Sequence, residues 1–262
     1  MSEPILQVDE ITLRFGGVTA IHGVSFHVNE GELFSIIGPN GAGKTSIFNT
    51  ISQVYRPQEG DIRWKGESIM GHRPDYVAEL GIARTFQNIE LFPQMTVIDN
   101  LLLGRHVCMK SSWLAGALWF GPARKEEMEN RRRVEDIIDF LEIVEWRQHP
   151  VALLPYGIQK LVELGRALAM DPELLLLDEP VAGMNLEETE DTARYILEIK
   201  EELGISMILV EHDMGLVMDI ADRIMVLDFG EKIAEGTPEV VQNDPNVIAA
   251  YLGSSDLHVA NE

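Results

Sequence analysis

The sequence predicts an α/β fold in which a mostly parallel sheet carries helices on its faces. One observation is local: an apolar run at residues 33–37 precedes a glycine-rich loop, and a helical pattern follows over residues 45–53. The other is the alternation, from residue 174 onward, of short apolar runs with helical patterns. Such alternation is typical of parallel strands joined by helices, and 262 residues suffice for one large domain or two small ones.

The N-terminal part of the chain is expected to form short strands. Turn residues at 16–17 and 29–31 separate the apolar runs, and residues 60–69 alternate in a strand-like way around Ile62 and Trp64. The predicted strands before the glycine-rich loop cover residues 5–8, 11–15, 24–28 and 33–37.

The middle of the chain has a helical pattern from about residue 97 to residue 166. Within it, Val134, Ile137, Ile138 and Leu141 recur at the spacing of one helix face. Because this block separates the glycine-rich loop from the last strands, it predicts a discontinuous second subdomain. The last strands are expected at residues 174–177, 206–210 and 224–227, with helices near 187–202 and 214–221.

Composition excludes several classes of protein. The net charge of −22 argues against a general nucleic-acid binder, and the basic run at residues 131–133 is expected to be a solvated helix face. Cys108 is the only cysteine, which fits a reducing compartment. No signal peptide is visible, and the apolar run at residues 113–120 is far shorter than the ~20 residues that span a bilayer. We expect a soluble chain, with this run packed inside the helical subdomain rather than against a partner.

The glycine-rich loop, residues 38–45, matches the pattern G-x-x-x-x-G-K-[ST] of a phosphate-binding P-loop. Its glycines let several backbone N–H groups point at one anion. Lys44 is predicted to reach the terminal phosphates, and the Thr45 hydroxyl to bind Mg²⁺. The loop opens a helix, whose N-terminus favours negative charge.

A second motif follows the leucine run at residues 174–177, which suits a strand buried on both faces. Asp178 and Glu179 come at the carboxyl end of that strand, the edge at which α/β sheets place ligands. Asp178 fits a Mg²⁺-holding acid of a P-loop enzyme, and Glu179 is then free to polarise a water. Asp-Glu-Pro is also ordinary turn chemistry, but its combination with a P-loop favours function.

These motifs and four others make the chain resemble the ATP-binding subunit of ABC transporters. Gln87 matches the Q-loop, which contacts the metal and faces the membrane partner. His212 matches the switch histidine at the γ-phosphate, and residues 181–185 match the D-loop. Phe15 matches the aromatic residue that stacks on adenine. The resemblance assigns nucleotide binding to Phe15, Gly38, Pro39, Asn40, Gly41, Ala42, Gly43, Lys44, Thr45 and Ser46.

The resemblance covers nearly the whole chain. It implies a P-loop NTPase (RecA-like) core with an antiparallel β subdomain and an inserted α-helical subdomain. The expected nucleotide-binding domain spans residues 1–255, with its core at 1–86 and 166–255, the helical subdomain at about 87–165 and a tail at 256–262. The implied cofactors are ATP and Mg²⁺, with Thr45, Gln87 and Asp178 at the metal. Lys44, Gln87, Glu179 and His212 are the implied catalytic residues.

The importer ATPases for branched-chain amino acids are the most similar members, on the runs at residues 81–87, 95–101 and 234–238. This similarity implies a peripheral protein on the cytoplasmic face of the inner or plasma membrane. Its implied partners are transmembrane permease subunits, a second ATPase subunit in a homo- or heterodimer and, indirectly, an extracytoplasmic binding protein. Importers of urea or other amides look similar.

The motif that acts on the partner's ATP departs from the family pattern Leu-Ser-Gly-Gly-Gln. It reads Leu154, Pro155, Tyr156, Gly157 and Ile158. Pro155 replaces the serine whose hydroxyl would bond the γ-phosphate across the dimer, and it has no N–H to donate.

Two alternatives remain open: a soluble ABC ATPase of DNA repair, translation or cluster assembly, and a nucleotide-gated assembly module without turnover. A P-loop GTPase or kinase is not supported, because the chain has no Asn-Lys-x-Asp guanine motif.

Overall fold

The protein is described here by a computed structural model, which covers residues 4–108 and 122–251. The chain forms two compact units. The first holds the chain up to Val77, Leu176–Glu179 and the chain from Ile196 onward, and the second holds Ala78–Leu175 and Pro180–Tyr195. The apolar run at residues 113–120 lies outside the described residues.

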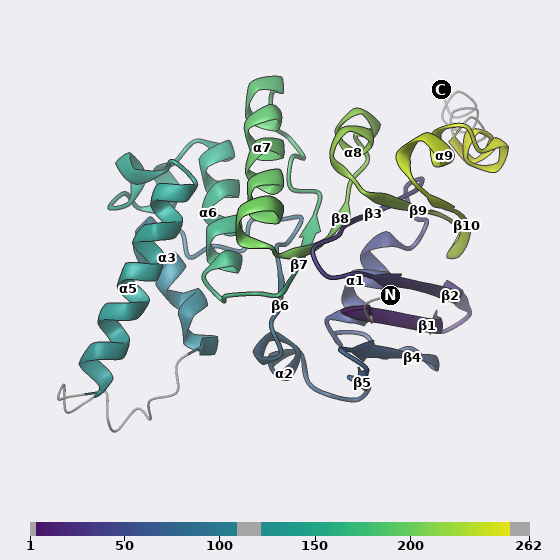
Figure 1. The fold of residues 1–262 in the computed structure, drawn as a ribbon, viewed down its shortest axis with the longest axis horizontal. Coiled ribbons are helices and arrows are strands. Elements are labelled where there is room, and N and C mark those ends of the chain that lie inside the picture. The colour runs from purple at the N-terminus through teal and green to yellow at the C-terminus, as the bar shows by residue number, and fades with distance from the viewer. Residues whose placement is uncertain (1–3, 109–121, 252–262) are drawn as a thin grey trace. The chain divides into compact units, whose positions relative to one another are not determined.

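The first unit contains an antiparallel sheet with the strand order β2-β1-β4-β5 (Figure 1). The two strands predicted at 5–8 and 11–15 are one strand, because pairing with β2 and β4 resumes after a register shift at Glu10, whose φ is 46°. The strand predicted at 60–69 is divided by a turn at residues 65–66. The bounds are β1 Leu6–Phe15, β2 Val18–Val28, β4 Glu59–Trp64 and β5 Glu67–Ser68.

The first unit also contains the parallel strands. β3 (Leu33–Ile37) lies between β8 (Ser206–Val210) and β9 (Arg223–Asp228) and runs parallel to both, while β10 (Glu231–Gly236) is antiparallel to β9. The end of β7 (Leu174–Asp178) lies beside β8. Every residue of β3, β7 and β8 is buried, as the apolar run of β3 and the leucine run of β7 predicted.

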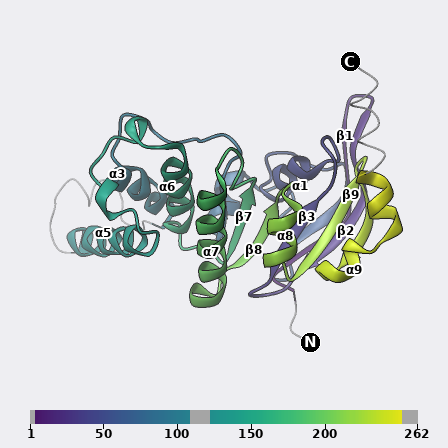
Figure 2. The same ribbon diagram turned by 90° about the horizontal axis from the view of Figure 1, so that it is seen from above.

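Helices cover both faces of the parallel strands. Figures 1 and 2 show α8 (Met214–Ile220) and α9 (Pro238–Gln242) on one face and α1 (Lys44–Ile51) on the other. Strand β10 and helix α9 were not predicted, because the strand is mostly polar and partly exposed and the helix is short.

The second unit is mainly helical. Gly165 of α6 lets α3 and α5 approach closely, since a Cβ at Gly165 would lie 3.3 Å from a methyl of Leu101 in α3 and 3.4 Å from one of Ile137 in α5. The predicted apolar face of α5 is buried. Strand β6 lies beside the first residues of β7. The elements are α2 Pro74–Glu79 at the boundary, β6 Ile82–Arg84, α3 Val97–Gly104, α5 Pro122–Phe140, α6 Tyr156–Leu168 and α7 Leu186–Leu203, with 3-10 turns at Arg105–Cys108, Val144–Trp146 and Val151–Leu153.

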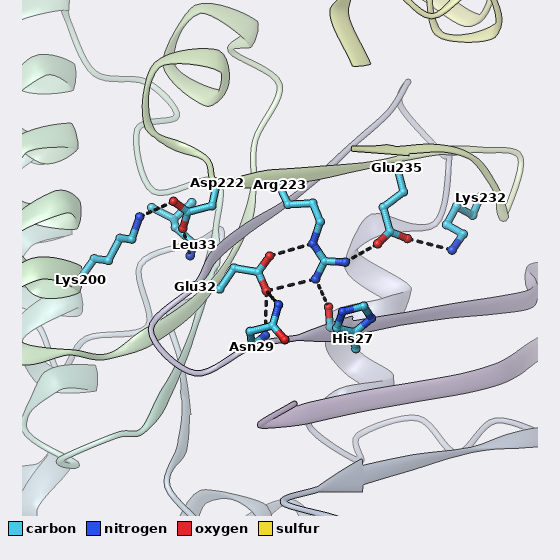
Figure 3. Close-up of polar contacts among 9 residues, drawn as sticks. All are labelled: His27, Asn29, Glu32, Leu33, Lys200, Asp222, Arg223, Lys232 and Glu235. Carbon is cyan, nitrogen blue, oxygen red and sulfur yellow. Dashed lines mark hydrogen bonds and ion pairs between the residues drawn. The ribbon is translucent and has the colours of Figure 1, made fainter. Parts of the chain in front are cut away.

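A charged network joins the two sheets of the first unit at Arg223 (Figure 3). The Arg223 guanidinium donates to both carboxylate oxygens of Glu32, at 2.8 and 3.1 Å, and also contacts the Glu235 carboxylate. Its second terminal nitrogen donates to the His27 carbonyl of β2 at 2.6 Å. Asn29 also donates to Glu32, from its backbone and from its side chain. Through these contacts Arg223 of β9 links β2 and β10.

We expect Arg223→Met to lower the free energy of unfolding by about 3–5 kcal/mol, because Glu32 would stay largely buried without its cation and Glu235 would keep only its ion pair with Lys232. Urea denaturation of the full chain measures this change. The matched control is Arg14→Met, which removes an exposed ion pair with Glu59 and should cost less than about 1 kcal/mol. Equal losses in the two variants would contradict the role of the network.

Phe229 occupies a strained turn. Asp228 pairs with Glu231, so Phe229 and Gly230 form a two-residue hairpin loop, and both have positive φ, 43° and 82°. This type I′ turn favours Asn-Gly, and Phe229 as a residue is 85% exposed. We expect Phe229→Asn to raise the free energy of unfolding by about 1 kcal/mol, visible as a higher Tm. An unchanged or lower Tm would show that Phe229 contributes to folding by another route.

Candidate functional site

The P-loop is shaped by close backbone contacts in the first unit. Gly38 has a φ of 151°, and a Cβ there would lie 2.1 Å from the carbonyl oxygen of Leu227 in β9. The loop closes with a hydrogen bond from Ala42 N–H to the Pro39 carbonyl at 3.1 Å. Among the described side chains none caps the N-terminus of α1 at Gly43, so its first N–H groups are placed to bind an anion.

Lys44 is the first residue of α1, and 7% of its surface is exposed. Its Nζ donates to the loop carbonyls of Gly38 at 2.7 Å and Pro39 at 3.1 Å. Burial lowers the pKa of Lys44, while the carboxylates of Glu179, Asp178 and Glu211 act in the opposite direction. The ammonium therefore lies inside the P-loop, within the electrostatic influence of these three carboxylates.

Glu179 follows β7 in an unusual backbone conformation, with a φ of 48°. Its N–H donates to the Val210 carbonyl at the end of β8, at 2.9 Å. A non-glycine residue in this left-handed region costs about 1–3 kcal/mol and is often found at functional sites. Asp178, the neighbour of Glu179 and the last residue of β7, is buried.

His212 follows β8 and lies on the same side as Glu179. Its Nδ1 is 3.9 Å from an oxygen of Glu179 and 3.8 Å from one of Glu211. The buried Glu211 carboxylate accepts the backbone N–H of His212 at 3.0 Å, and Asp213 caps α8 by accepting from Leu216 at 3.1 Å. The exposed imidazole is thus held by its backbone between two acidic side chains. Glu211 was not predicted, although it follows a mostly apolar strand, as Asp178 follows the leucine run.

Phe15 ends β1 with a partly exposed ring, 46% of the residue. It meets Tyr55 edge to face, with ring centroids 5.0 Å apart. An open aromatic face of this kind can stack on a planar base.

The donor set fits Mg²⁺ bound together with phosphates. Within residues 4–108 and 122–251, no group of three or more His, Cys, Asp and Glu side chains could hold a metal by itself. Mg²⁺ in phosphate-transfer sites is instead held by one or two protein oxygens, substrate phosphates and water. The exposed Thr45 hydroxyl at the start of α1 and the Asp178 carboxylate can supply those oxygens.

Gln87 lies in the second unit and is exposed. The backbone around it contacts three charged residues of α6: Lys160 donates to the Gln87 carbonyl at 2.8 Å, and Glu163 and Arg166 contact residues 86–90. Sequence reasoning missed these α6 residues, because charges on a helix read as solvated. The feature of the sequence that could have identified them is that they alternate with the apolar residues Leu161, Val162, Leu164 and Ala167, all of which are buried.

The 154–158 motif and the D-loop contact each other in the second unit. The Tyr156 hydroxyl donates to the Ala182 carbonyl at 3.2 Å, and a Cβ at Gly157 would lie 2.5 Å from an oxygen of Glu188. Helix α6 begins at Tyr156, with Pro155 at its N-cap, and no described side chain caps it. The motif thus presents uncapped N–H groups at a helix N-terminus.

The sequence matches two family descriptions: "ABC transporter" over residues 21–182, and "Branched-chain amino acid ATP-binding cassette transporter" over residues 231–256. It is 41% identical over 255 residues to the high-affinity branched-chain amino acid transport ATP-binding protein BraF of Pseudomonas aeruginosa, covering 97% of this chain and 100% of the relative. It is 39% identical, with the same coverage, to LivG of Escherichia coli, which carries the same description.

Solved structures agree with these relatives. The ADP conformation of MJ1267, an ATP-binding cassette of an ABC transporter, superposes with a TM-score of 0.83 at 33% identity, covering 96% of this chain and 100% of that one. A nucleotide-free ATP-binding cassette from an ABC transporter gives a TM-score of 0.82 at 32% identity, covering 95% and 98%. No helix in the described part of this chain has the length and apolarity to cross a membrane. The chain belongs to the ABC transporter family, whose ATP-binding cassettes hydrolyse ATP to power transport.

Proposed function

We propose that this chain is the ATP-hydrolysing subunit of an importer for branched-chain amino acids. One observation carries the proposal: the P-loop lysine, Asp178, Glu179 and His212 gather in one unit, on a chain similar over 97% of its length to ATP-binding proteins of such transporters. The substrate follows from the relatives' names, BraF and LivG, and from the second family description.

The residues divide the work of ATP hydrolysis. Phe15 stacks on the adenine, and residues 38–46 bind the phosphates through backbone N–H groups. When phosphate binds, Lys44 exchanges its hydrogen bonds to the Gly38 and Pro39 carbonyls for bonds to phosphate oxygens, which places a negative charge directly against its buried ammonium. Glu179 accepts a proton from the attacking water or orients it, and His212 holds the γ-phosphate. Thr45 and Asp178 would hold Mg²⁺ through their oxygens, with Gln87 as the further ligand that the resemblance implies, and the ion would supply positive charge against the phosphate charge that grows during transfer.

The complete site is proposed to need a second cassette. Large apolar side chains are exposed at or next to the 154–158 motif and the D-loop: Leu153, Tyr156 and Leu186. We propose that this surface faces the ATP of the other subunit, in a homo- or heterodimer attached to permease subunits at the cytoplasmic membrane face. An extracytoplasmic binding protein would deliver the amino acid to the permease.

Affinity purification of the tagged chain from solubilised membranes tests the assembly. We expect permease subunits and a second cassette to co-purify, and ATPase activity to depend on them. Recovery of the chain free of membrane subunits, with full ATPase activity, would favour a soluble ABC ATPase. Uptake assays with leucine and urea then separate the proposed substrate class from amides.

Pro155→Ser tests whether the 154–158 motif impairs the opposite site. A serine hydroxyl at the N-cap of α6 can bond the γ-phosphate across the dimer, and a charge-assisted hydrogen bond contributes about 1.5–3 kcal/mol. We expect the variant to raise the ATPase rate of the reconstituted complex by about tenfold or more. Pro74→Ser, which makes the same chemical change at the exposed first residue of α2, is the matched control and should leave the rate within a factor of about two. An unchanged rate in Pro155→Ser would make the proline functionally silent.

A further inference from the structure

Two buried charges on α6 bind the backbone of the segment that carries Gln87, residues 86–90. Lys160 is 5% exposed and Glu163 is 2% exposed. The Lys160 Nζ donates to the Gln87 carbonyl at 2.8 Å. One oxygen of Glu163 accepts the N–H groups of Phe86 and Glu90, at 3.3 and 3.5 Å. The two residues are three positions apart, so they share one face of α6.

Arg166, one turn further along α6, extends the same contact. Its guanidinium donates to the Glu90 carbonyl. All four of these hydrogen bonds go to main-chain atoms of residues 86–90, and both ends of the segment are bound. The contacts therefore fix where the segment runs, whatever its side chains are.

Stability alone does not account for this arrangement. Burial raises the pKa of Glu163 and lowers that of Arg166, which means that the fold disfavours their charged forms there, although Lys160 and Arg166 offset this for the glutamate. Apolar residues of similar volume often replace buried ion pairs without loss of stability. Buried ionic groups of this kind are better explained by the geometry that they impose.

That geometry joins two functional elements. Helix α6 starts at Tyr156, inside the 154–158 motif, and one turn later it carries the residues that bind the Gln87 segment. Gln87 is exposed, so its position is set by its backbone and not by burial of its side chain.

We propose that Lys160 and Glu163 are positioning residues that hold Gln87 at a fixed place relative to the start of α6. The proposal rests on the role of Gln87 in the proposed function. Through these contacts, displacement of the 154–158 motif when a second cassette closes moves the Gln87 segment as well.

The test replaces the charged pair by an apolar pair, Lys160→Met with Glu163→Met, in the full chain. We expect an unchanged or higher Tm, because the two opposite charges are removed together and Arg166 keeps its contacts with Glu90. Hydrogen–deuterium exchange at residues 86–90 should rise by about tenfold or more, since the segment opens locally. The ATPase rate of the assembled transporter should fall, with a higher Mg²⁺ concentration needed for half-maximal activity. Glu190→Met, an exposed glutamate of α7, is the matched control and should change none of these readouts.

Two further variants make the result decisive. Glu163→Gln keeps an acceptor oxygen and should restore most of the exchange protection. In a Gln87→Ala background, the methionine pair should reduce the ATPase rate no further. Unchanged exchange at residues 86–90 in the methionine pair would overturn the proposal. The proposal would also be overturned if the methionine pair exchanges faster at residues 86–90 but keeps full ATPase activity, while Gln87→Ala is impaired. If Gln87→Ala itself is fully active, the role of Gln87 fails instead, and with it the functional part of this proposal.

Discussion

Glu179→Gln should reduce the ATPase rate by about 10²–10⁴-fold, the usual contribution of a general base. The amide keeps the size of the carboxylate and can still accept a hydrogen bond, but it cannot take a proton from water. Glu179 lies at the end of β7 with its carboxylate 3.9 Å from His212, so the change is confined to the proposed reaction centre. ATP binding, measured by equilibrium dialysis, should be retained, because the variant traps ATP.

The control for this variant is Glu202→Gln, an exposed glutamate at the end of α7. It makes the same chemical change away from the P-loop and should leave the ATPase rate unaltered. Near-normal turnover in Glu179→Gln would remove Glu179 from its assigned role and would direct attention to Glu211, the other carboxylate beside His212.

Gly38→Ala should destabilise the first unit by several kcal/mol and abolish ATP binding. The added Cβ would lie 2.1 Å from the Leu227 carbonyl oxygen, and a backbone atom of a buried strand cannot move aside as a side chain can. Either β9 or the P-loop must shift, and a shifted loop no longer directs its N–H groups at one phosphate. Thermal unfolding and nucleotide binding of the same sample measure the two effects.

Gly41→Ala is the matched control. Gly41 has a φ of 83°, but no described atom lies within 4 Å of the position of its Cβ. The variant should therefore show only the cost of a left-handed backbone, about 1–2 kcal/mol. If Gly38→Ala is as stable as Gly41→Ala, the P-loop can accommodate a Cβ at Gly38, which would contradict the close contact with β9.

The parts of the fold that the sequence predicted are those set by local pattern. Mostly apolar runs at β3, β7 and β8 correspond to strands in which every residue is buried, and the P-loop pattern requires a strand before it and a helix after it. The positions of Asp178 and Glu179 followed, because residues after a buried parallel strand lie at the sheet edge where ligands bind.

What the sequence could not predict depends on contacts between distant segments. β1 continues past Glu10 only because β2 and β4 pair with it on both sides of the irregularity. The left-handed conformation of Glu179 has no sequence signal, since glutamate rarely adopts it. Lys160, Glu163 and Arg223 read as surface charges, and only the fold brings them to buried partners.

The most direct test of the account is ATP-dependent leucine uptake into proteoliposomes that contain this chain with the permease and cassette subunits that co-purify with it. We expect uptake to require ATP on the side of the vesicle membrane that carries the cassettes. Glu179→Gln should abolish this uptake while the complex stays assembled. Leucine uptake that proceeds equally with wild-type chain and with Glu179→Gln would contradict the claim that ATP hydrolysis by this chain powers import.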